Sequence, residues 1–91
     1  MFATQKGGFS WQVAPDLRIG AIYRTPTTVD VALFEDSQRK PSGAPWSPDH
    51  PFDRNHGVFE VLQRHCGDEA LHVLRLLNGE LATLHQEGSA R

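Results

Sequence analysis

Three short runs of alternating apolar and polar residues lie within residues 9–34, FSWQVAPDLRIGAIYRTPTTVDVALF. Each run is typical of a β-strand, because successive side chains of a strand point to opposite faces. The runs are separated by Ala14-Pro15-Asp16 and by Thr25-Pro26-Thr27, where proline ends a strand and favours a turn. Because connections this short join antiparallel neighbours, the stretch predicts a three-stranded antiparallel meander.

The alternation also predicts which face of this sheet is buried. The expected core face carries the larger apolar residues, which are Trp11, Ile19, Tyr23, Val31 and Leu33. The opposite face still holds Ile22, Ala32 and Phe34, beside Arg18 and Arg24. A sheet face in contact with water needs no apolar residues. Either later parts of the chain wrap round this second face, or it meets a partner.

Residues 36–55 predict a Pro-rich loop, which is much longer than the usual connection of about four to six residues. Its last three prolines, at positions 45, 48 and 51, are spaced by three, the period of a polyproline II helix. On that template Trp46, Asp49 and Phe52 share one ridge. This ridge either packs back onto the sheet or docks into a partner.

The last third of the chain begins with a predicted helix over residues 56–66. Its apolar residues recur at helical spacing, and Asp53 or Asn55 is expected to cap its first turn. Gly67 follows as a residue that commonly ends a helix.

Residues 69–86 fit more than one structure. Leucines at helical spacing favour a second helix through Leu77. A further option ends this helix at Leu77, with Gly79 near its cap, and returns residues 80–85 as a strand. Asn78-Gly79 is also a strong β-hairpin signal, which would pair Leu76 with Leu81. The whole pattern predicts an α+β fold, with the C-terminal elements packed on the sheet.

Length and composition restrict the kind of protein. With 91 residues, the chain is expected to form one small domain over residues 1–91, with frayed ends at 1–7 and 87–91. A single cysteine excludes an intrachain disulfide, and no apolar stretch reaches the length of a membrane span. No apolar signal segment is visible at the N-terminus, so a cytoplasmic location is expected.

Two polar groups are candidates for other kinds of site. Asp49, His50, Asp53 and His56 could together hold a metal ion or a small ligand, although their spacing matches no closed metal motif. Arg18 and Arg24 could bind nucleic acid on one side of the sheet, but a net charge of −2 makes this less favoured. The sequence contains no recognisable catalytic set and no cofactor motif, so neither an enzyme nor a cofactor is expected.

The aromatic residues of the Pro-rich loop and the apolar residues on the second sheet face favour a small non-enzymatic protein that binds another protein. It would act as an accessory regulator or inhibitor of bacterial or phage type, by occupying a surface of a larger protein. A homodimer is compatible with the small core. Aromatic residues and arginine are enriched among interface hot spots. The expected contact residues are Trp46, Phe52, Asp49, Arg54, Arg39, Ile22 and Phe34.

Overall fold

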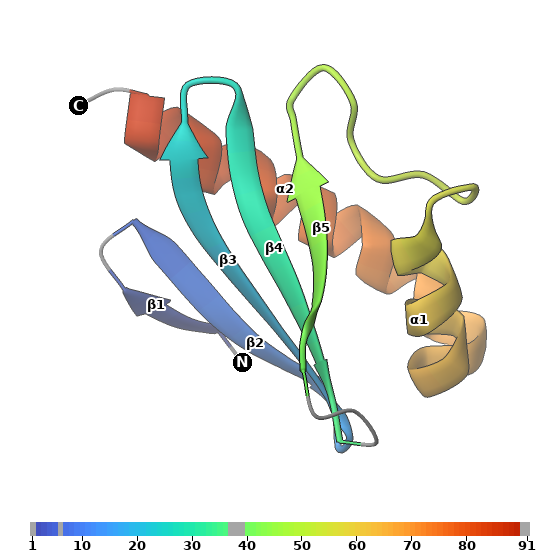
Figure 1. Cartoon of the computed structure of the whole chain (residues 1–91). Helices are drawn as coiled ribbons and strands as arrows, with labels where there is room; N and C mark the ends of the chain where they lie inside the picture. The colour runs from blue at the N-terminus through green and yellow to red at the C-terminus, as the bar shows by residue number, and fades with distance from the viewer. Residues whose placement is uncertain (1, 6, 37–39, 90–91) are drawn as a thin grey trace.

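The fold is a five-stranded antiparallel sheet followed by two helices (Figure 1). The computed structural model describes residues 2–5, 7–36 and 40–89. The strands follow one another in space in chain order, so the sheet is a simple meander. The elements are β1 (Phe2–Gln5), β2 (Gly8–Ala14), β3 (Leu17–Thr25), β4 (Thr28–Glu35), β5 (Ser42–Trp46), α1 (Gly57–Cys66), a 3-10 turn (Gly67–Glu69) and α2 (Ala70–Ser89).

Both helices pack on the same face of the sheet. In Figure 1, α2 runs behind the strands, and it contacts β3 and β4, while α1 contacts the end of β2. The core face is the predicted one: Trp11, Ile19, Val31 and Leu33 are buried, and Tyr23 is half-buried beside them. The predicted α+β architecture is confirmed.

The sheet is wider than the predicted three strands, because a strand is added at each edge. At one edge, Phe2–Gln5 pairs with β2, where the sequence predicted a frayed end. At the other, Ser42–Trp46 pairs with β4, so this part of residues 36–55 is a strand and the polyproline interpretation is wrong there. Pro45 is compatible with β5 because an edge strand needs partners on one side only.

Helix α1 begins one residue later than predicted and has a different cap. The side chain of His56, rather than Asp53 or Asn55, accepts a hydrogen bond from the Val58 amide at 3.1 Å. Gly67 ends the helix with a positive φ of 57°, as its position in the sequence predicted.

Residues 70–89 form one continuous helix, α2, so the predicted second helix is confirmed, while the hairpin and the option that ends the helix at Leu77 are wrong. The apolar stripe continues on either side of Asn78-Gly79, since Leu74, Leu77, Leu81 and Leu84 are all buried. Burial of this stripe outweighs the cost of about 1 kcal/mol for a glycine inside a helix. The predicted frayed end begins at residue 87, but the helix continues to Ser89.

Candidate functional site

A row of small residues crosses the face of the sheet that faces away from the helices. Ser10, Gly20, Ala32 and Gly43 lie opposite one another on β2, β3, β4 and β5. Because their side chains are short or absent, this row forms the floor of a groove that runs across the strands. None of the described elements covers it, and we call this surface the open face.

Bulkier residues line both sides of the groove. Arg18 and Phe34 are register partners along one side, and Ile22 and Asp30 are register partners along the other, with Pro45 next to Asp30 on β5. The groove has a volume of about 860 Å³. It therefore has room for part of another molecule, and most of the side chains that line it are apolar.

Charged groups on the open face are held in defined positions. The guanidinium of Arg18 lies over the Phe34 ring, 4.1 Å from its centroid, and donates to the Ser10 hydroxyl at 3.4 Å. Arg24 donates to the Asp30 carboxylate through Nε at 2.7 Å. The two arginines of the nucleic-acid alternative therefore lie near this face, but an acidic group balances the charge of Arg24.

Six of the seven predicted contact residues separate into three groups. Ile22 and Phe34 are on the open face, and Ile22 is the most exposed large apolar side chain within residues 7–36 and 40–89, at 62%. Asp49 and Arg54 are exposed in the segment between β5 and α1 and do not line the groove. Arg39 lies outside the described residues.

Trp46 and Phe52 form the third group, and the structure corrects their assignment as surface contacts. They are only 2% and 3% exposed, so the ridge that they were expected to form packs back against the core. Asn78 on α2 holds both: its side-chain oxygen accepts from Trp46 Nε1 and from the Phe52 amide, each at 3.1 Å. Its amide group donates to the Phe52 carbonyl at 2.8 Å. Sequence reasoning missed Asn78 because Asn-Gly is itself a turn signal.

The four residues of the metal alternative have separate roles. His56 caps α1 and lies against the Phe52 ring, with 4.6 Å between ring centroids. Asp53 accepts a hydrogen bond from the Asn55 amide, while Asp49 and His50 are exposed. Across residues 7–36 and 40–89, no three His, Cys, Asp or Glu side chains are placed to hold one metal ion.

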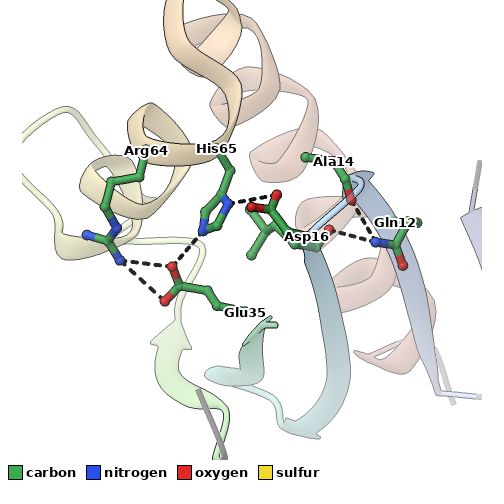
Figure 2. Close-up of polar contacts among 7 residues, drawn as sticks. Gln12, Ala14, Asp16, Glu35, Arg64 and His65 are labelled. Carbon is green, nitrogen blue, oxygen red and sulfur yellow. Dashed lines mark hydrogen bonds and ion pairs between the residues drawn. The ribbon is translucent and has the colours of Figure 1, made fainter. Parts of the chain in front are cut away.

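An ionic network centred on the buried side chains of Glu35 and His65 lies at the C-terminal end of β4, where α1 meets the sheet (Figure 2). Glu35, at the end of β4, accepts from Arg64 Nη2 at 3.0 Å and lies 2.6 Å from His65 Nε2. The other ring nitrogen of His65 lies 2.9 Å from an Asp16 carboxylate oxygen. Because both ring nitrogens face carboxylates, the contacts favour the doubly protonated imidazolium form of His65. The network ties the β2–β3 turn and β4 to α1.

The pKa values of the network follow from these contacts. The hydrogen bond to Glu35 is the main reason why the pKa of His65 is raised, and burial partly opposes it. The hydrogen bond from His65 is likewise the main reason why the pKa of Glu35 is lowered. Burial raises the pKa of the neighbouring Cys66 thiol, so this cysteine is protonated at neutral pH and a poor nucleophile.

We expect the free energy of unfolding to be highest between about pH 4.5 and 6.5. The His65 contribution is complete below its usual pKa of 6.5 and is lost as the pH rises through the raised value in the folded state. The Glu35 contribution is complete above 4.5 and is lost as the pH falls through its lowered value. Urea titrations from pH 6 to pH 9 should show the free energy of unfolding fall by about 1.5–3 kcal/mol, the range for hydrogen bonds to charged groups.

His65→Gln should remove most of this dependence above pH 6, because glutamine does not titrate. His72→Gln is the matched control, since His72 is an exposed histidine on α2. An unchanged slope above pH 6 in His65→Gln would show that another group is responsible.

No protein-family model, no curated protein and no solved structure matches this chain. Within the described ranges, neither helix has both the length and the apolar character needed to span a membrane. The geometry of the open face is therefore the main guide to function.

Proposed function

We propose that this protein is a small protein-binding module that acts by occupying a surface of a larger protein through its open face. The observation that carries this proposal is the exposure of Ile22 on a groove that Phe34 and Pro45 also line, on a sheet face that the described helices leave uncovered. An antiparallel sheet with one face in water normally presents polar side chains there. Contiguous exposed apolar residues with a polar rim are typical of interaction surfaces.

The composition of the open face supports a protein partner. Its core is apolar, and charged residues lie beside the groove, as in most protein interfaces. Arg18 is held over Phe34 before any partner binds, which lowers the entropy cost of using that side chain in a contact. Arginine and aromatic residues are frequent among side chains that dominate binding energy.

A photo-crosslinking residue tests the proposal directly. We expect a photoreactive amino acid at position 22 to form a covalent adduct with a distinct, larger protein in the cells that make this chain. The same residue at position 76 should not form that adduct. Leu76 is a matched control because it is also a large exposed apolar side chain, 44% exposed, and it lies on α2 away from the groove. Mass spectrometry of the adducts identifies what is bound.

Identical adducts at positions 22 and 76 would contradict a specific role for the open face. An adduct with nucleic acid at position 22 would instead support the alternative that involves Arg18 and Arg24. In that case binding should weaken steeply as the salt concentration rises.

A further inference from the structure

The groove of the open face has the dimensions of an α-helix. Its floor is the row of small residues that crosses β2, β3, β4 and β5. Neighbouring strands lie about 4.8 Å apart, so this row is about 14 Å long. Arg18 and Ile22 stand on opposite walls, four residues apart on β3, which separates their Cα atoms by about 13 Å. A helix with its side chains is about 10–12 Å across, so the groove has room for between two and three turns.

The open face has few free backbone groups to offer to a partner. β2, β3 and β4 each have a strand on both sides, so most of their N–H and C=O groups are paired within the sheet. An extended segment that lay on this face would leave its own backbone groups without partners, which is costly when they are buried. The edge strand β5 is poorly suited to strand addition, because Pro45 has no N–H to donate. A helix pairs its backbone internally and needs only side-chain contacts, so this face favours a helix.

The floor allows such a helix to approach closely. Gly20 and Gly43 have no side chain, and Ala32 between them has only a methyl group. A glycine within a strand often marks a place where another backbone comes near. Apolar side chains of the helix can therefore reach the floor and contact Ile22 on one wall and Phe34 on the other.

The charge of the groove indicates which helix fits. Arg24 is paired with the Asp30 carboxylate, so the wall that carries Asp30 is close to neutral. Arg18 on the other wall is exposed, and its guanidinium contacts only neutral groups, the Phe34 ring and the Ser10 hydroxyl. No carboxylate of residues 7–36 or 40–89 forms an ion pair with Arg18. The wall that carries Arg18 is therefore complementary to an acidic side chain.

From these features we propose that the partner inserts an amphipathic α-helix into the groove, with an acidic residue on the flank that faces Arg18. The inference rests on the proposed function and names the part of the larger protein that the open face binds. The apolar side of the helix, with residues spaced by three and four, lies on the floor of the groove. The acidic side chain accepts hydrogen bonds from the Arg18 guanidinium, and bonds of this charged kind are stronger than neutral ones.

The spacing of crosslinks distinguishes a helix from an extended segment. A photoreactive amino acid is placed at position 12 or at position 45, near opposite ends of the groove. Gln12 is an exposed residue of β2 and the register partner of Arg18, and Pro45 is exposed on β5. A helix covers the distance of about 14 Å between these strands in about nine residues, and an extended segment covers it in about four. We expect two adducts on one segment of the partner, about nine residues apart, located by mass spectrometry after digestion.

Charge reversal tests the acidic flank. A synthetic peptide that covers both adduct positions should bind Arg18→Glu at least about tenfold more weakly than the unaltered chain, because two negative charges then face each other. Arg75→Glu is the matched control, since it makes the same change of charge at an exposed position of α2 away from the groove, and its affinity should stay within about twofold. A peptide with lysine in place of the facing acidic residue should bind Arg18→Glu within about threefold of the original affinity. Circular dichroism must show that each variant folds.

The outcomes separate the helix from the proposed function. Adducts about four residues apart, or on unrelated segments, would contradict the helix, while an adduct at position 22 would leave the proposed function standing. Equal affinities of Arg18→Glu and Arg75→Glu for the peptide would contradict the acidic flank. The absence of any partner adduct at positions 12, 22 and 45 would overturn the proposed function together with the helix.

Discussion

Asn78→Ala should lower the free energy of unfolding by about 2–4 kcal/mol. The change removes three hydrogen bonds, and it leaves the indole N–H of Trp46 and the backbone of Phe52 without the Asn78 partners. A buried donor or acceptor that loses its partner costs about 1–3 kcal/mol. Because Trp46 is only 2% exposed, water reaches its N–H poorly after the change. Denaturation in urea, followed by circular dichroism, measures the loss.

Thr83→Ala is the matched control, because Thr83 is an exposed residue of the same helix whose hydroxyl bonds only back to the Gly79 carbonyl among the bonds described. We expect that change to stay within about 0.5 kcal/mol of the original stability. In Asn78→Ala, the Trp46 indole proton should also exchange with solvent faster. If Asn78→Ala were as stable as Thr83→Ala, the three bonds would not hold the β5–α1 segment to α2.

The alternation over residues 9–34 predicted the central strands and their buried face because a strand's period of two is fixed by backbone geometry. It also placed Ile22 and Phe34 on the opposite face, where the structure has them. The edge strands were missed for different reasons. The Pro-rich composition around β5 masked its pairing with β4, and the pairing of β1 depends on a turn at Gly7 that has a positive φ of 78°.

Asn78-Gly79 shows how tertiary contacts outweigh a local signal. In a short peptide this pair favours a tight turn. In the folded chain the Asn78 side chain instead bonds to a segment more than twenty residues earlier, and the helix continues. The sequence alone gave no reason to place these segments together.

The ionic network could not be predicted for a similar reason. Asp16, Glu35 and His65 are far apart in the sequence, and no local pattern relates them to one another. Only the packing of α1 against the ends of β2 and β4 brings them together. The small-residue row of the open face likewise depends on strand register, which connects Ser10, Gly20, Ala32 and Gly43 across four strands.

Gly8→Ala should lower the free energy of unfolding by about 2–3 kcal/mol. A Cβ atom at this position would lie 2.6 Å from the main-chain oxygen of Ala21 on the neighbouring strand, which is closer than real Cβ contacts. A backbone oxygen in a sheet moves only if the strands move, so the clash must separate β2 from β3. Overpacking of this kind typically costs about 1–3 kcal/mol, and here it also disturbs the hydrogen bond from the Tyr23 amide to the Gly7 carbonyl.

Gly43→Ala is the matched control for Gly8→Ala, because Gly8 and Gly43 line the same groove. Apart from its chain neighbours, no atom lies within 4 Å of a Cβ built at Gly43. We expect that variant to be as stable as the original chain or to gain up to about 1 kcal/mol, since alanine restricts the unfolded chain more than glycine does. The same urea denaturation measures both variants. Equal stability of Gly8→Ala and Gly43→Ala would mean that β2 and β3 lie farther apart at Gly8 than the structure places them, and the groove would then be wider at that end.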